Sequence, residues 1–269
     1  MQENYNNNLS SSDIDAKLQR DVLENEDKVE NGIIIIIVAI IIIFHGSIFY
    51  WLKFGIAIPS GYDYHPIPIT SEPIQIDYAN STKAEKTFMY KSLINNNKMQ
   101  MAPQAHYELS GRVVAFNHDF LFISKFFDSA ALYDLGLSWG RLSDPKYFKQ
   151  KYIKIYSMKT ELTGARRLSW TWREDTPFTR DYIMSHISHT HVIPANNNIM
   201  AAMLKLKNYD KVKIEGELVD MNYLNTFGGD LIEYHTSLSR TDNDDSSRGS
   251  GACEAVYVTK VQIGNLIYK

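Results

Sequence analysis

The chain has 269 residues, a formal net charge of −3 at pH 7 and a sequence isoelectric point near 6.2. This mildly acidic balance, with no basic stripe along the chain, argues against a nucleic-acid-binding protein. A lone cysteine, Cys253, excludes a disulfide within the chain. The part that follows the first 52 residues is long enough for one large or two small domains with a proper core.

The chain begins with a polar tail, residues 1–31, whose composition predicts that it is largely disordered. A short helix is predicted after Ser12, because Ile14, Leu18 and Val22 recur at four-residue spacing. That helix is either a frayed, solvated turn or a stripe that touches a partner or the membrane surface.

The most distinctive stretch is residues 32–52, which read GIIIIIVAIIIIFHGSIFYWL. It has about the 20 apolar residues that a helix needs to cross a bilayer. In lipid a helix satisfies every backbone amide within the segment, so a transmembrane helix is predicted, with residues 33–52 in contact with the bilayer. The alternative is a helix or strand buried in a protein core.

Lysine and arginine counts on the two sides of this helix predict its orientation. Lys17, Arg20 and Lys28 precede it, whereas Lys53 is followed by no basic residue until Lys83. The positive-inside rule then places the amino terminus in the cytoplasm. The expected location is the bacterial inner membrane, single-pass, with the carboxy-terminal domain in the periplasm. A cleaved signal peptide is the alternative, but its charged region would be too long and too acidic.

Four prolines between residues 59 and 73 predict an extended stalk at residues 53–72, followed by one domain at residues 73–269. Helices are predicted at residues 81–97, 128–140 and 196–207. Strands are predicted at residues 73–79, 106–116, 120–127, 147–158, 168–173, 231–238 and 252–262, with a strand bent near Gly216. The expected fold class is α+β, mainly β, with a small barrel in about the last hundred residues.

Three histidines form the motif H-x-x-H-x-H, at His186, His189 and His191. On a strand His189 and His191 would share a face, and on a helix His186 and His189 would. Three imidazoles can hold zinc, copper or nickel with a water in the fourth position. Alternatively, they are structural and hydrogen-bond a turn before Pro194.

Cys253 has two interpretations. Paired with one of these histidines, it would form a thiolate–imidazole nucleophile. Strand alternation instead places it with Ala255 and Tyr257, as a buried and inert thiol. No glycine-rich phosphate loop or dinucleotide fingerprint is present, so the sequence assigns no cofactor.

Four segments carry a resemblance to other proteins. They are LSWGRLSD (residues 137–144), SHISHTHVIPAN (185–196), TSLSRTD (236–242) and GACEAVYV (251–258). Together they resemble a group of bacterial proteins that have one amino-terminal membrane helix and no established activity. The pattern of that group runs S-H-x4-H-x-I-P-A, T-S-L-x-R-x-D and G-A-C-E, and the resemblance covers about residues 110–262. It implies one shared site, structural or functional, at His186, His191, Asn196, Arg240, Asp242, Cys253 and Glu254.

Two functional hypotheses follow from this sequence. In the first, a membrane-anchored protein uses its extracytoplasmic domain to bind or scaffold a partner in the envelope. In the second, it is an envelope hydrolase that uses His186 or His191 with Cys253 or a metal ion.

Overall fold

The computed structural model describes residues 28, 31–43, 55–94, 97–118, 130–159, 166–224, 231–240 and 253–269. The chain divides into two units, residues 1–54 and 55–269. The predicted tail helix and the predicted strand at residues 120–127 lie outside the described residues.

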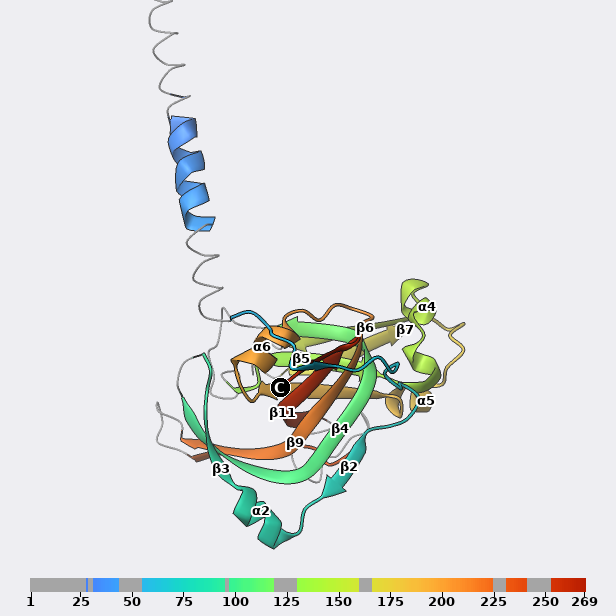
Figure 1. Cartoon of the computed structure of the whole chain (residues 1–269). Helices are drawn as coiled ribbons and strands as arrows, with labels where there is room; N and C mark the ends of the chain where they lie inside the picture. The colour runs from blue at the N-terminus through green and yellow to red at the C-terminus, as the bar shows by residue number, and fades with distance from the viewer. Residues whose placement is uncertain are drawn as a thin grey trace, which may run out of the picture. The chain divides into compact units, whose positions relative to one another are not determined.

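In the first unit, residues 31–43 are helical, and all of them except Asn31 belong to the apolar stretch of residues 32–52 (Figure 1). Its isoleucines are exposed to solvent, for example Ile35 and Ile43. Across the described parts of the chain, no helix combines the length and the apolar character needed to span a membrane. The transmembrane helix therefore stays a prediction.

The second unit is mainly β with a few short helices, as the sequence predicts (Figure 1). Its strands are β1 (Gly61–Tyr62), β2 (Ile74–Asp77), β3 (Phe88–Lys91), β4 (Lys98–His118), β5 (Tyr133–Ser138), β6 (Ile153–Lys159), β7 (Arg166–Trp172), β8 (Ile187–Pro194), β9 (Lys211–Leu224), β10 (Leu231–Tyr234), β11 (Cys253–Ile263) and β12 (Leu266–Tyr268). Its helices are α2 (Asn80–Lys86), the 3-10 helix η1 (Gly140–Ser143), α4 (Pro145–Lys149), α5 (Arg180–Met184) and α6 (Asn197–Met203).

Five strands pair in a closed ring, in the order β4-β5-β8-β11-β9 and back to β4. All neighbours are antiparallel except β8 and β11, which run parallel. Paired residues share a face, so the register assigns one set of side chains to the inside of the ring. These are fully buried and mostly apolar: Leu109, Val113, Leu135, Leu137, Val192, Ile214, Leu218, Val256 and Val258.

The opposite face carries charged pairs on β4, β9 and β11, which identifies it as the outside of the ring. Lys213 Nζ lies 2.7 Å from Glu108 Oε1, and Lys260 Nζ lies 2.8 Å from Glu215 Oε2. The sequence places the barrel in the last hundred residues, but β4 and β5 supply two of the five strands. The ring therefore begins well before the predicted region.

Gly216 allows β9 and β11 to approach closely within the ring. A Cβ atom at this position would lie 2.1 Å from the backbone oxygen of Tyr257, closer than real Cβ atoms come. A register shift lies in the same pairing, between Val258 and Lys260 of β11, and the bend of β9 near Gly216 stays a prediction.

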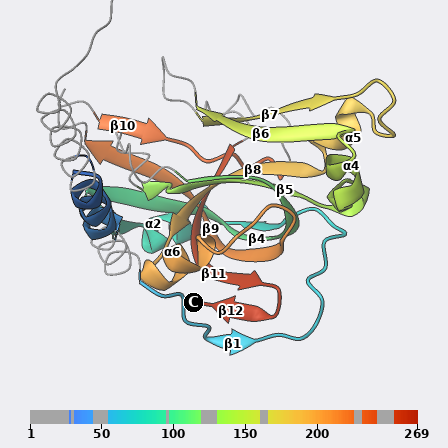
Figure 2. The same ribbon diagram turned by 90° about the horizontal axis from the view of Figure 1, so that it is seen from above.

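Helix α6 confirms the predicted helix at residues 196–207 at its start, although it ends at Met203. The Asn196 side chain accepts a hydrogen bond from Ile199 N at 2.9 Å and caps the helix. The predicted inward residues Ile199, Ala202 and Met203 are fully buried. Figure 2 shows the β6–β7 hairpin and the β1–β12 pair on opposite sides of this unit.

One predicted element is wrong in type. The helix predicted at residues 128–140 contains strand β5, whose six residues are all buried. A strand covered on both faces shows no alternation of apolar and polar residues, so its pattern cannot be told from that of a buried helix.

Two further predictions are confirmed in part. The helix predicted at residues 81–97 is present at its start as α2, after which the chain forms β3. The strand predicted at residues 147–158 is present from Ile153 as β6, and α4 occupies its start.

Candidate functional site

The candidate site lies on the outer face of three neighbouring strands, β5, β8 and β11. In the register, His191 pairs with Asp134 on one side and with Ala255 on the other. His189 pairs with Cys253 in the same manner. Because side chains alternate along β8, His189 and His191 point to the same face, as expected for this motif on a strand.

The histidines occupy the space between two apolar clusters. On the same face of β8, Ile187 belongs to one cluster and Ile193 to the other. His189 and His191 are only 1% and 3% exposed, and Asp134 is 1% exposed. The backbone here is strand up to Pro194, so the predicted hydrogen bonds to a turn before that proline are wrong.

Asp134 orients His191. The Nδ1 atom of His191 lies 2.7 Å from Oδ1 of Asp134, so the ring donates its Nδ1 proton to the carboxylate. This contact selects the tautomer in which Nε2 is left with its lone pair. An imidazole held in this way is suited to bind a metal ion or to accept a proton.

His189 stands between the carboxylate and the thiol. Its Nδ1 atom lies 3.1 Å from Sγ of Cys253, and its Nε2 atom lies 3.8 Å from Oδ1 of Asp134. The Nε2 atom is buried and has no hydrogen-bond partner among the described residues. A buried polar atom in this state carries a desolvation cost that a bound ligand would offset.

His189, His191 and Cys253 each offer a ligand atom, and these atoms lie within 4.8 Å of one another. The centroids of the two imidazole rings are 4.6 Å apart, and the ring planes are inclined at 62° to each other. Two imidazoles and a thiol form a donor set that suits zinc or copper(I), and poorly suits magnesium or calcium. The residues present therefore fit a transition-metal ion.

The thiol itself is half-buried, and the chain around it is held by the segment that follows β10. Ser237 N donates to the backbone oxygen of Cys253 at 3.1 Å, and Ala255 N donates to Oγ1 of Thr236 at 2.9 Å. Thr236 N donates in turn to Oδ1 of Asp220 at 2.9 Å. The T-S-L and C-E motifs are thus neighbours in space, and hydrogen bonds between the two segments pair their backbone groups.

His186, which the motif groups with His191, has different neighbours. Its ring stacks on Tyr182 with centroids 3.8 Å apart, and its Nδ1 atom lies 2.9 Å from the Tyr182 oxygen. A Cβ atom on Gly140 would lie 2.9 Å from the ring of His186, and Gly140 has a φ of +60°. These contacts describe a structural histidine at the start of β8.

The remaining residues of the predicted shared site that the structure describes do not join the Cys–His cluster. Glu254 is fully buried and, by alternation along β11, points into the ring. Burial raises the pKa of the Tyr107 hydroxyl there well above its usual value, and the charge of Glu254 raises it further.

Arg240 Nη1 lies 4.0 Å from Oε1 of Glu72, and Asp242 lies outside the described residues. Asn196 caps α6.

Sequence reasoning missed Asp134 and favoured His186 over His189. The signal for Asp134 was a carboxylate within the apolar run AALYDLGL, residues 130–137. In a helix Asp134 would lie on the solvated face. Because the pattern of the run predicts a helix, it does not reveal Asp134 as a buried carboxylate.

No protein-family model, no curated protein and no solved structure matches the chain.

Proposed function

We propose that this protein is a membrane-anchored envelope protein whose carboxy-terminal domain binds one transition-metal ion, zinc or copper(I), through His189, His191 and Cys253. The observation that carries the proposal is the cluster of two imidazoles and one thiol with ligand atoms within 4.8 Å of one another. The two strands that carry them, β8 and β11, are adjacent, so the folded sheet holds the ligands in place before any metal binds. Preorganised ligands reduce the entropic cost of binding.

Asp134 would be the outer partner of one ligand. A metal-binding histidine usually donates its second ring nitrogen to a carboxylate or carbonyl, and His191 does this to Asp134 at 2.7 Å. Three protein ligands leave the fourth position of a tetrahedral zinc ion for water or substrate. This arrangement would let the bound ion polarise a substrate.

The connectivity of the ring supports a binding role. Taken in chain order, its strands β4, β5, β8, β9 and β11 pair as 1-2-3-5-4-1, with the third and fifth parallel. Helix α6 lies between the third and fourth strands. This is the connectivity of an OB-fold, in which ligands bind on the face of the second and third strands. In this domain those strands, β5 and β8, carry Asp134, His189 and His191.

The location belongs to the same proposal. Residues 33–52 would contact the bilayer as a single transmembrane helix, with the tail in the cytoplasm and residues 55–269 in the periplasm. The isoleucines of residues 31–43 are exposed in the structure, which fits a segment that meets lipid.

Metal binding can be measured on the full chain in phosphatidylcholine nanodiscs, stripped with a chelator and reloaded with zinc or with copper under reducing conditions. We expect one tightly bound ion per chain by elemental analysis. We also expect loss of this ion in Cys253→Ser and His191→Ala, and retention in His65→Ala, since His65 is exposed. A folded wild-type protein that retains no ion, or a Cys253→Ser variant that binds like the wild type, would refute the metal centre.

A second candidate is a hydrolase in which Cys253 is the nucleophile and His189 its base. The observation that favours it is the 3.1 Å distance between Sγ and Nδ1. The metal-free protein would then react with an acylating probe to form a thioester at Cys253. We expect His189→Ala to slow this labelling, as seen by intact mass. If added zinc leaves the labelling rate unchanged, the thiol is not a metal ligand.

Binding of an envelope partner by the same domain remains a prediction. The OB-type connectivity supports it, because this fold serves as a recognition module. Site-specific photo-crosslinking in intact cells would test it from Glu233, an exposed residue next to Tyr234, whose ring lies 6.4 Å from that of His191. The exposed helix α2 is the control surface, and equal crosslinking from both positions would contradict the prediction.

A further inference from the structure

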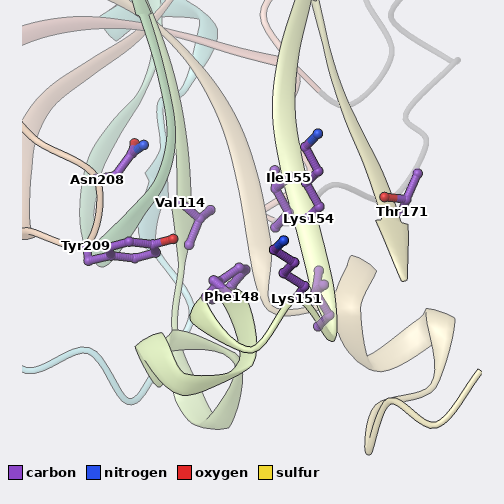
Figure 3. Close-up of a pocket in the computed structure, with 9 residues that line it drawn as sticks. Val114, Phe148, Lys151, Lys154, Ile155, Thr171, Asn208 and Tyr209 are labelled. Carbon is purple, nitrogen blue, oxygen red and sulfur yellow. The ribbon is translucent and has the colours of Figure 1, made fainter. Parts of the chain in front are cut away.

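A cleft lies between the edge of β4 and the β6–β7 hairpin, with a volume of about 470 Å³. Figure 3 shows Val114 and Tyr209 on one side and Ile155 and Lys151 on the other. Ligand-binding pockets in proteins are typically about 300–1,000 Å³. The lining residues of this cleft do not include those of the Cys–His centre, so it is a separate feature of the domain.

Three local irregularities of the backbone meet at this cleft. Val114 is the extra residue of a β-bulge, because the register of β4 against β5 shifts between Val113 and Ala115. Lys151 and Tyr209 have φ values of 59° and 76°, and they are the two non-glycine residues with positive φ in the described part of the chain.

Such features tend to mark functional sites. A β-bulge re-aims side chains next to active and binding sites, and non-glycine residues in left-handed conformation persist where function requires them. Lys151 follows the end of α4 at a position where glycine is usual. The convergence of a bulge and two such residues on one hollow indicates a binding site.

The chemistry of the lining is amphipathic. The walls are apolar, because Phe148, Ile153 and Ile155 are buried and belong to one hydrophobic cluster. Lys151 and Lys154 line the cleft, and the lining residues that the structure describes include no carboxylate. Lys154 alternates with Ile153 and Ile155 along β6, and its Nζ atom lies over the Tyr156 ring. Lys151 is therefore the cation available to an anionic ligand.

The cleft continues into a second hollow of about 310 Å³, and the two share Val114, Ile155 and Asn208. The second hollow extends along β4 to Asn117. The lining of this second hollow is mainly polar, so the apolar part of the floor lies in the first hollow, where it favours a short acyl chain.

We propose that this cleft binds an anionic amphiphile with one acyl chain. Lys151 contacts its carboxylate or phosphate head, and the chain lies on Ile153, Ile155 and Phe148. The ligand is either a free acid or the headgroup end of an anionic lipid. The two share the same recognition chemistry.

The test uses the full chain in phosphatidylcholine nanodiscs, with octanoate labelled with carbon-13 at its carboxyl group as the probe and empty nanodiscs as the blank. Octanoate is expected to bind with a shift of its carboxyl resonance. Affinity should rise about two- to fourfold for each methylene from hexanoate to decanoate, because each added methylene is removed from water. Octanol and octylamine should bind at least tenfold more weakly than octanoate.

Variants separate recognition from folding. Lys151→Gly should weaken octanoate binding about tenfold while raising thermal stability, because glycine adopts the positive φ without strain. Asn208→Trp, at an exposed position, should block the cleft with the fold intact. Lys91→Met removes an exposed lysine of β3 and should leave binding unchanged.

Adding phosphatidylglycerol to the nanodiscs distinguishes an anionic lipid from a free acid as the ligand. If phosphatidylglycerol competes with octanoate, the occupant is a lipid headgroup. If it does not compete, the occupant is a free acid. The proposal is overturned if octanol binds as tightly as octanoate, if Lys151→Gly leaves the affinity unchanged, or if Lys91→Met weakens it equally. These outcomes are independent of metal binding at Cys253.

Discussion

The Nδ1 atom of His191 lies 2.7 Å from Oδ1 of Asp134, and both side chains are almost fully buried on adjacent strands. Inside a protein such a charge-assisted hydrogen bond is stronger than in water. It fixes the orientation of the ring that we propose as a metal ligand. A carboxylate in this place therefore acts on the metal through the histidine, as a positioning residue.

Replacing this carboxylate gives the first prediction. Asp134→Asn keeps the shape but removes the charge, so His191 becomes a weaker and less firmly held ligand. We expect metal affinity to fall about 10- to 100-fold, measured by competition with a chromophoric chelator. The thiolate-to-cobalt absorption of the cobalt-loaded protein should persist, because Cys253 remains bound. Unchanged affinity would show that Asp134 does not position the ligand.

The second prediction concerns the close approach at Gly216. In Gly216→Ala the new Cβ would meet the backbone oxygen of Tyr257, so strands β9 and β11 must separate. We expect a loss of about 2–3 kcal/mol in the free energy of unfolding, measured with urea. Gly61→Ala is the matched control, since nothing lies within 4 Å of its Cβ position. Equal stability of the two variants would contradict the close packing.

The third prediction separates a capping role from a site role for Asn196. Asn196→Ala removes the hydrogen bond to Ile199 N and should lower stability by about 1 kcal/mol. Asn196→Asp keeps an acceptor and should restore most of this stability. Metal stoichiometry should be the same in both variants. Loss of metal in the Asp variant would place Asn196 in the site instead.

The fourth prediction follows from Glu215, whose pKa is lowered from its usual value of 4.5 chiefly by the hydrogen bond from Lys260. A carboxyl group with a lowered pKa in the folded state adds stability above its unfolded pKa, and this stability is lost as pH falls through the folded pKa.

Glu215→Gln should therefore be less stable than the wild type at pH 7, by under about 1 kcal/mol because the pair is partly exposed. The difference should shrink below about pH 4.5 and vanish in stronger acid, where Glu215 is protonated in both states. Urea unfolding of both proteins across this range measures it. A difference that grows in acid would contradict the assignment.

The fifth prediction tests the proposed location. A phosphatase that is active only in the periplasm, fused after Lys269, should be active in cells. The same fusion to a chain that lacks residues 33–52 should be inactive. A cytoplasmic carboxy terminus in the full chain would overturn the orientation predicted from Lys17, Arg20 and Lys28.

The elements that sequence alone determined are those with a local cause. The mainly β class follows from short aromatic and β-branched segments, as in β11. The start of α6 follows from Asn196, whose amide side chain caps the helix. The apolar residues that follow recur at helical spacing and form the buried face of α6. A glycine within an alternating strand predicts a special backbone position at Gly216, and β9 and β11 approach closely there.

Tertiary structure alone decided which residues meet. Strand β5 is buried on both faces, so its local pattern is that of a helix, and only its partners β4 and β8 make it a strand. Its pairing brings Asp134 to His191, which is 57 residues away in the chain. The parallel pairing of β8 with β11 brings His189 to Cys253 and leaves His186 just before the start of β8, where its ring stacks on Tyr182. The local sequence pattern indicates on which face of a strand a side chain lies. Which residue lies beside it on the adjacent strand depends on how distant segments of the chain pair.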